Sequence, residues 1–162
     1  MKTAHKTIPQ EKTSLQMSKW IKASPAKVFG AWSKAELMSQ WFTPDMQKIT
    51  PLVEADFRVG GTYSIRMKRP ENSHMVSGKY LEIVPDKKIS FTWVWEGKGG
   101  SCSEELPEPI KVDSIVTVEF KEKNGGTDVV LTHERLPDEE QVKRHTEGWT
   151  GCLGTLAGFV EK

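Results

Sequence analysis

The spacing of apolar residues changes along this chain and divides it into distinct parts. From Ser14 to Ala23, apolar and polar side chains alternate, which is typical of a half-buried strand. The following segment places its apolar side chains three or four residues apart, as on one face of a helix. A spacing of two returns at Ile49 and holds as far as His133, where helical spacing resumes. The pattern predicts a strand, a helical segment, a group of strands and a last helix.

Two short helices are predicted after the first strand. Ser24 is a suitable N-cap, and Pro25 suits the first helical position because it lacks an N–H and has a fixed φ. Ser33 is predicted to cap the second helix, which ends at Pro44 because proline cannot continue a helix. The apolar faces of the two helices hold Val28, Phe29 and Trp32, and Leu37, Met38 and Trp41.

The middle of the chain predicts about six antiparallel strands, because strands joined by short turns usually pair with their neighbours. Gly60-Gly61 is typical of a turn, and Asn124-Gly125-Gly126 is typical of a tight hairpin. The longest irregular stretch runs from Gly97 to Pro109, and its role as a lid or a contact is left open. The predicted strands are Ile49–Ala55, Tyr63–Lys68, Met75–Val84, Ile89–Glu96, Val112–Lys121 and Thr127–His133.

Pro137-Asp138 opens a last helix of about 20 residues, which runs to the end of the chain. The strands have one apolar face that needs a cover, and this helix is the only sizeable one. The sequence therefore predicts an α+β fold, with a curved antiparallel sheet of six or seven strands around the helix. Glycines opposite the apolar face indicate the close approach of a partner, a helix that yields to admit a ligand, or tolerated surface positions. The apolar face holds Val142, Trp149, Leu153, Leu156 and Val160, and the glycines are Gly148, Gly151, Gly154 and Gly158.

Composition and charge limit the functional classes. The 162 residues fit one domain, with residues 1–13 as a disordered lead and residues 14–162 as the domain. The 23 Lys and Arg are interleaved with 22 Asp and Glu, so no basic stripe predicts a nucleic-acid partner. No apolar run approaches the roughly 20 residues of a membrane span, and the polar start predicts a cytoplasmic protein without membrane insertion. Cys102 and Cys152 are expected to be free thiols.

Four segments carry distinctive spacings of aromatic and turn residues. They are SPAKVFGAWSKAELMSQWFTP, FRVGGTYSIRM, GKYLEIVPDKKISFTWVW and LTHERLPDEEQVKRHTEGWTGCLGTLAGFVEK. In this order they resemble the START-like (SRPBCC, Bet v 1-like) helix-grip superfamily, in its branch similar to the C-terminal domain of activators of the Hsp90 ATPase. The resemblance covers nearly all of residues 14–162. It implies a cavity between the sheet and the last helix for a small hydrophobic or aromatic molecule.

The inward faces of the strands and of the last helix supply the predicted cavity wall, since side chains alternate between the two faces of a strand. Ligand pockets are mostly apolar with a few polar groups, a description that tryptophans, tyrosines and a single histidine fit. The alternative is that the same residues are simply core. The candidate ligand-binding residues are Trp32, Trp41, Tyr63, Ile65, Met67, Tyr80, Phe91, Trp93, Trp95, Val118, Leu131, His133, Trp149, Leu153 and Leu156.

Two titratable residues are candidates for chemistry in such a cavity. His133 shares strand parity with Val129 and Leu131, so it is predicted to point inward. It is either a neutral, hydrogen-bonded histidine or a group that orients a ligand or exchanges a proton. Glu82 shares parity with Tyr80, and a buried carboxylate there would have a raised pKa. The alternative for Glu82 is a solvated surface position.

Three functions remain open at this stage, and the binding of a small hydrophobic molecule is favoured. The second is a partner of an Hsp90-type ATPase, although no further domain precedes residue 14. The third is a cyclase-, hydratase- or hydrolase-like enzyme that uses His133 or Glu82 in the same cavity. No nucleophile elbow, phosphate loop or zinc motif supports catalysis, so no cofactor and no metal are predicted. A homodimer is left open.

Overall fold

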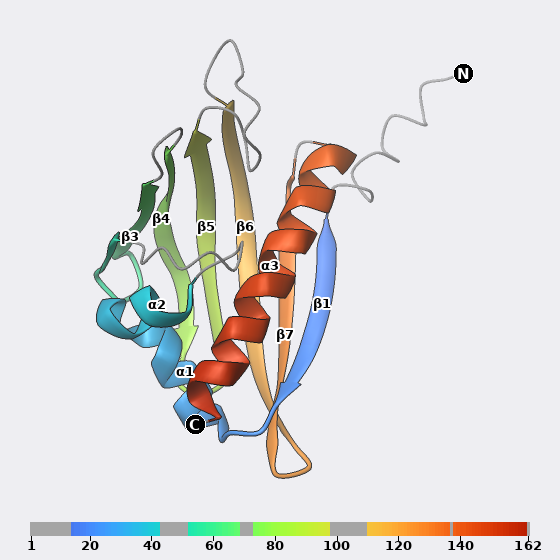
Figure 1. Ribbon diagram of the computed structural model, residues 1–162. Helices are drawn as coiled ribbons and strands as arrows, with labels where there is room; N and C mark the ends of the chain where they lie inside the picture. The colour runs from blue at the N-terminus through green and yellow to red at the C-terminus, as the bar shows by residue number, and fades with distance from the viewer. Residues whose placement is uncertain (1–13, 43–51, 69–72, 98–109, 137, 162) are drawn as a thin grey trace.

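The computed structural model describes residues 14–42, 52–68, 73–97, 110–136 and 138–161 (Figure 1). These residues form three helices and seven strands, in the order that the sequence predicts. The elements are β1 (Leu15–Ile21), α1 (Pro25–Ser33), α2 (Ala35–Trp41), β2 (Leu52–Ala55), β3 (Thr62–Lys68), β4 (Ser73–Val84), β5 (Lys88–Gly97), β6 (Ile110–Lys123), β7 (Gly126–Glu134) and α3 (Glu139–Val160).

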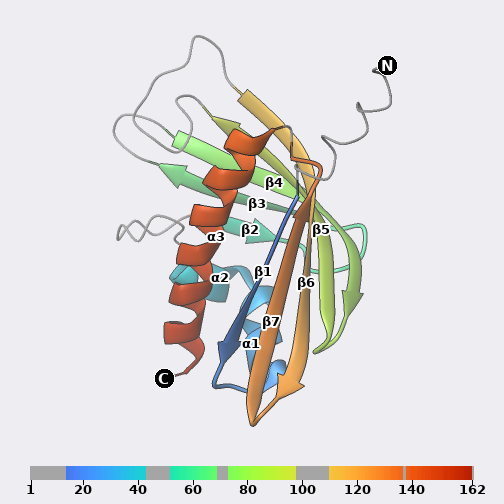
Figure 2. The same ribbon diagram turned by 90° about the vertical axis from the view of Figure 1, so that its right-hand side faces the viewer.

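All seven strands form one antiparallel sheet in the order β1-β7-β6-β5-β4-β3-β2. Strands β2 to β7 pair with their neighbours in sequence, and the first strand joins the other side of the last. The three helices lie on one side of this curved sheet (Figure 2). The predicted α+β architecture, with two short helices after β1 and a long helix after β7, is confirmed.

Alternation along the strands places one set of side chains in the core. In β7, Val129, Leu131 and His133 are buried, whereas Val130 and Thr132 are only partly covered. In α3, the buried residues Trp149, Cys152, Leu153, Leu156, Ala157 and Val160 follow helical spacing. The inward faces that the sequence predicts are therefore the faces that the core uses.

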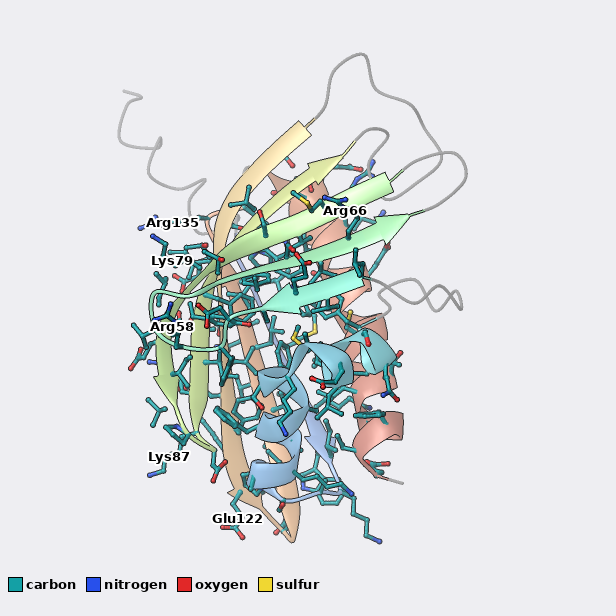
Figure 3. The ribbon with its side chains drawn as sticks, turned by 90° about the vertical axis from the view of Figure 1, so that its left-hand side faces the viewer. Arg58, Arg66, Lys79, Lys87, Glu122 and Arg135 are labelled. Carbon is teal, nitrogen blue, oxygen red and sulfur yellow. The ribbon has the colours of Figure 1, made fainter. Side chains whose placement is uncertain are left out.

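Charged side chains occupy the outer surface. Arg58, Lys79 and Lys87 are exposed and point away from the interior in Figure 3. Among the described residues, the buried polar side chains are Ser90, Ser114, Thr127 and His133, and none of these is Lys, Arg, Asp or Glu. No described helix is long and apolar enough to cross a membrane.

The first helix begins as predicted, but the second does not. Ser24 caps α1, since its side chain accepts a hydrogen bond from the Lys27 N–H, and Pro25 is the first helical residue. The prediction that Ser33 caps α2 is wrong. Ser33 is the last residue of α1, where its hydroxyl donates to the Gly30 carbonyl, and Lys34 takes the N-cap position without a side-chain hydrogen bond. A serine can satisfy a carbonyl one turn back as readily as a following N–H.

Several predicted features fall outside the described residues. These are the disordered lead of residues 1–13, the helix stop at Pro44, the start of the strand predicted from Ile49, and most of the irregular stretch from Gly97 to Pro109. Gly97 itself is the last residue of β5.

The tight hairpin turn that Asn124-Gly125-Gly126 predicts is present between β6 and β7. Asn124 and Gly125 both have positive φ, of 51° and 79°. This combination is typical of the hairpin turn whose twist matches that of the flanking strands. The turn sets the register in which His133 lies opposite Val116.

Two glycines of α3 lie on its outer face. Gly154 and Gly158 are exposed, and a Cβ added at either position would meet nothing within 4 Å. Nothing in the described packing requires a glycine at these positions. Each one therefore lowers the stability of the helix without a compensating contact.

Replacing Gly154 and Gly158 together by alanine is expected to stabilise the fold, by about 1 kcal/mol per site. The rise in melting temperature would be roughly 2–4 °C for each kcal/mol in a domain of this size. Gly78→Ala is the matched control, because a methyl group there would collide with the Thr92 carbonyl oxygen. A double variant that melts below the wild type would show that these glycines serve a purpose other than tolerated surface positions.

Candidate functional site

The predicted cavity wall is buried wherever its side chains are described. The exceptions are Met67 and Trp95, whose side chains lie outside the described set. The buried members are Trp32, Trp41, Tyr63, Ile65, Tyr80, Phe91, Trp93, Val118, Leu131, His133, Trp149, Leu153 and Leu156. They come from α1, α2, α3 and the inward face of the sheet, so the fold brings together residues that are far apart in the sequence.

Aromatic rings join the helices to the sheet at the centre of this region. Trp149 of α3 stacks on Trp32 of α1, with ring centroids 6.3 Å apart and planes 28° apart. The ring centroid of Trp149 also lies 4.8 Å from that of Trp93 of β5. Phe42, which follows α2, lies within 5.8 Å of Trp149 and 6.1 Å of Trp93. Such ring pairs add to the stabilisation that burial of their surface provides.

A chain of hydrogen bonds runs through the buried His133. The Trp149 indole N–H donates to Nδ1 of His133 over 3.0 Å. The other ring nitrogen, Nε2, lies 2.7 Å from the Ser114 hydroxyl oxygen, and this hydroxyl donates to the Trp93 carbonyl over 3.0 Å. Since the indole can only donate, Nδ1 must accept, and the proton of the neutral ring sits on Nε2.

This proton placement decides what the Ser114–His133 pair can do. A histidine that activates a serine as a nucleophile must accept the hydroxyl proton on the facing nitrogen. Here Nε2 carries a proton and donates to Ser114, because the Trp149 N–H occupies Nδ1. The pair has the spacing of a catalytic dyad but the opposite polarity. The arrangement fits a structural histidine, with all its hydrogen bonds made.

A second histidine is held in a similar way. The Trp93 indole N–H donates to Nε2 of His145 over 3.2 Å, and Nδ1 of His145 lies 2.8 Å from the Gln141 carbonyl oxygen. His145 is therefore neutral, with its proton on Nδ1. The two histidine rings are 4.9 Å apart. Both nitrogens of each ring are engaged, and the described residues contain no group of three His, Cys, Asp or Glu side chains suited to a metal ion.

Burial favours the neutral form of both histidines. It lowers the pKa of His133 well below 6.5, and the nearby His145 lowers it further. Burial also lowers the pKa of His145, an effect that Arg144 strengthens and the Gln141 carbonyl opposes. At neutral pH the interior therefore holds two uncharged imidazoles.

The tyrosines are neutral as well. The Tyr63 hydroxyl donates to the Thr92 carbonyl over 2.6 Å, and burial raises the pKa of Tyr63 well above 10. Burial raises the pKa of Tyr80 to about 12, with a smaller contribution from the charge of Asp56. Gly78 lies opposite Tyr63 in the sheet and leaves room for the Thr92 carbonyl.

Glu82 does not face the interior, so of the two alternatives that the sequence left open, the solvated surface position is the one that the structure has. Its side chain is exposed and lies 3.1 Å from the ammonium group of Lys88. The register of β4 shifts between Tyr80 and Glu82, which leaves Leu81 as an extra residue. A bulge of this kind reverses the alternation, so residues beyond it change face.

Two residues that take part in the hydrogen bonds around His133 and Trp93 were not identified from the sequence. These residues are Ser114 and His145. Ser114 extends the inward series of Val116 and Val118 by one step, so strand parity could have identified it. His145 lies one turn before Trp149, on the same side of α3, and helical spacing could have identified it. The pairing of His145 with Trp93 joins residues 52 positions apart and left no local pattern.

Trp32 differs from the other buried tryptophans in the hydrogen bonding of its indole N–H. Trp41 donates its indole N–H to the Ala31 carbonyl over 2.9 Å, and Trp93 and Trp149 donate to histidines. The Trp32 indole nitrogen is also buried, but it has no hydrogen-bond partner among the described residues.

Comparison with known proteins gives a family and a set of structural neighbours. The family model described as "Activator of Hsp90 ATPase homolog 1-like protein" matches residues 22–161. No curated protein matches the chain.

Solved structures match over almost the whole chain. A protein from Chromobacterium violaceum is 25% identical, with a TM-score of 0.71, and the match covers 93% of this chain and 98% of that one. An uncharacterized protein from Rhizobium leguminosarum is 28% identical, with a TM-score of 0.71 and coverage of 91% and 93%. An AHSA1-like protein from Aeromonas hydrophila is 19% identical, with a TM-score of 0.70 and coverage of 91% and 92%. These likenesses confirm the helix-grip fold.

The two neutral histidines make stability depend on pH. Because the folded state lowers both pKa values, the unfolded chain binds protons below about pH 6.5 that the folded chain does not. Stability is complete above that pH and is expected to fall below it, by up to about 1.4 kcal/mol per pH unit for each histidine. Urea unfolding at pH steps from about 7.5 to 5 measures this slope.

His145→Gln is the informative variant, because the amide oxygen can still accept from Trp93. The stability of this variant should fall less steeply with decreasing pH than that of the wild type, because only one titrating histidine remains of the two. Equal stability at both ends of this pH range would contradict the assignment of two neutral histidines.

Proposed function

The chain belongs to the family of activator of Hsp90 ATPase homolog 1-like proteins, and we propose that it binds a small, largely apolar molecule between the sheet and α3. Its helix-grip fold is commonly a ligand-binding fold. The observation that carries the proposal is the lining of the space between α3 and the middle strands. Large aromatic side chains face one another here, including Trp93 and Phe91 from β5 and Trp149 from α3.

The backbone arrangement supports this location. The backbone of α3 comes near α1, α2 and the edge strand β1. The middle strands reach α3 through side chains such as Trp93, which contacts Trp149 and hydrogen-bonds His145. Aromatic faces offer flat apolar surface to a ligand, and the indole and imidazole groups offer a few polar contacts.

Binding is favoured over catalysis by the same geometry. General acid–base catalysis needs a group that can exchange a proton with the substrate. His133 has both ring nitrogens engaged, and its Nε2 donates to Ser114 instead of accepting from it. Glu82 lies on the outer surface. Neither residue that the sequence suggested for catalysis is placed to act as a base in the interior.

Contact with an Hsp90-type ATPase is a second candidate function, and the description of the matched family favours it. An ATPase assay of such a chaperone, with and without this protein, tests it. Stimulated hydrolysis would support the chaperone role. An unchanged rate, together with ligand binding, would leave the binding of a small molecule as the function.

The proposal predicts saturable binding of neutral naphthalene derivatives. A ligand at about a hundred times its Kd would stabilise the fold by about 2.7 kcal/mol, which raises the melting temperature by roughly 5–10 °C. Binding should also quench tryptophan fluorescence, because several buried indoles line the proposed site.

A matched pair of variants locates the bound molecule. Trp149→Phe removes a buried indole of the proposed site and should reduce the quenching. Trp20→Phe removes an indole that is 42% exposed on β1 and should leave the quenching unchanged. Quenching that disappears with Trp20, or no saturable binding at all, would contradict the proposal.

A further inference from the structure

Trp32 is the buried tryptophan whose indole N–H lacks an acceptor among the described residues. Buried polar groups in folded proteins are nearly always hydrogen-bonded. Leaving a buried donor unpaired costs roughly 1–3 kcal/mol. The other buried indoles of the described chain meet this requirement with a carbonyl or a histidine. The exception at Trp32 therefore calls for a physical explanation.

The surroundings of Trp32 are aromatic. The side chain is only 3% exposed, so bulk water does not hydrate it. The rings of Trp41, Phe91, Phe120 and Trp149 surround it at centroid distances of 4.8 to 6.4 Å. None of these rings carries a carbonyl, a carboxylate or an unprotonated ring nitrogen. Since no described residue supplies an acceptor for the Trp32 N–H, this role is open to a molecule that enters the interior.

We infer that the bound molecule carries a neutral hydrogen-bond acceptor, such as a ketone, ester or amide oxygen, which accepts from the indole N–H of Trp32. This inference rests on the proposed function and specifies the chemistry of its ligand. The body of the molecule is apolar, to match the rings around Trp32. The acceptor oxygen lies at the edge of that body, where the indole nitrogen can reach it.

The charge of the interior explains why the acceptor is neutral. No Lys or Arg is buried among the described residues, and both interior histidines are uncharged because a Trp N–H occupies one nitrogen of each ring. The exposed cations that Figure 3 labels, such as Arg58 and Lys79, lie on the outer surface. A carboxylate would lose its hydration without gaining an opposite charge. The interior therefore selects against anionic ligands.

Three naphthalene compounds of similar size separate the effect of the hydrogen-bond acceptor from the effects of apolar contact and of charge. In 2-acetylnaphthalene the ketone oxygen is the acceptor, in 2-isopropenylnaphthalene a CH₂ group replaces that oxygen, and 2-naphthoate carries a charge. The wild type should bind the ketone about tenfold more tightly than the alkene, since one hydrogen bond to a buried donor is worth about that factor. It should bind 2-naphthoate more weakly than the ketone at neutral pH. Calorimetric titration measures all three affinities.

The indole resonances show which tryptophan is involved. In protein labelled with ¹⁵N at tryptophan, Trp32→Phe identifies the Trp32 N–H signal by its disappearance. Addition of 2-acetylnaphthalene should move this signal downfield, because a new hydrogen bond deshields the proton. The Trp41 signal is the internal control, since its N–H already donates to Ala31.

Trp32→Phe should also equalise the affinities for the ketone and the alkene, because it removes the donor and keeps an aromatic ring. If this variant does not fold, the difference between the wild-type affinities for the ketone and the alkene still decides the question.

Each outcome of the titrations separates the inference from the proposed function. Equal binding of ketone and alkene by the wild type would overturn the role of Trp32 and leave ligand binding intact; the ring faces around the N–H would then satisfy it. Tighter binding of 2-naphthoate than of the ketone would overturn the neutral acceptor. If none of the three compounds binds, the proposed function and the inference both fail.

Discussion

Each indole N–H that is buried in this protein needs an acceptor, and this requirement links the helices to the sheet. Trp149 joins α3 to β7 through His133, and Trp93 joins β5 to the same helix through His145. Trp41 joins α2 to α1 through the Ala31 carbonyl. Apolar packing alone would allow the helices to slide over the sheet, whereas these bonds each have one geometry. The position of α3 depends on them.

The same bonds fix the chemistry of the interior. An indole can only donate, so each histidine that faces one must present an unprotonated nitrogen. Both imidazoles are therefore neutral, and Ser114 next to His133 receives a hydrogen bond instead of losing a proton. An interior without charge is suited to holding an apolar molecule and poorly suited to proton transfer. The position of α3 and the proposed function thus both depend on the requirement that a buried indole N–H has a hydrogen-bond acceptor.

Most of the fold could be predicted from local spacing. Alternation identified the strands and the inward position of His133, and Asn124-Gly125-Gly126 identified the hairpin before β7. The features that local spacing left open or missed have physical causes. The extra residue at Leu81 turns Glu82 outward, and a bulge leaves little trace in a short apolar run. The pairing of Trp93 with His145 joins distant elements, which periodicity cannot report. Whether aromatic residues form a filled core or a ligand wall depends on side-chain rotamers, and composition does not determine these.

Native mass spectrometry of the protein isolated from its own cells, before and after exposure to a small-molecule extract of those cells, tests most directly whether the interior is a binding site. The account predicts a second species, heavier than the chain by the mass of one uncharged molecule, that returns to the bare chain on collisional activation. It also predicts that this molecule contains a carbonyl or comparable acceptor group. A bare chain under both conditions would contradict the account and identify the aromatic interior as core alone.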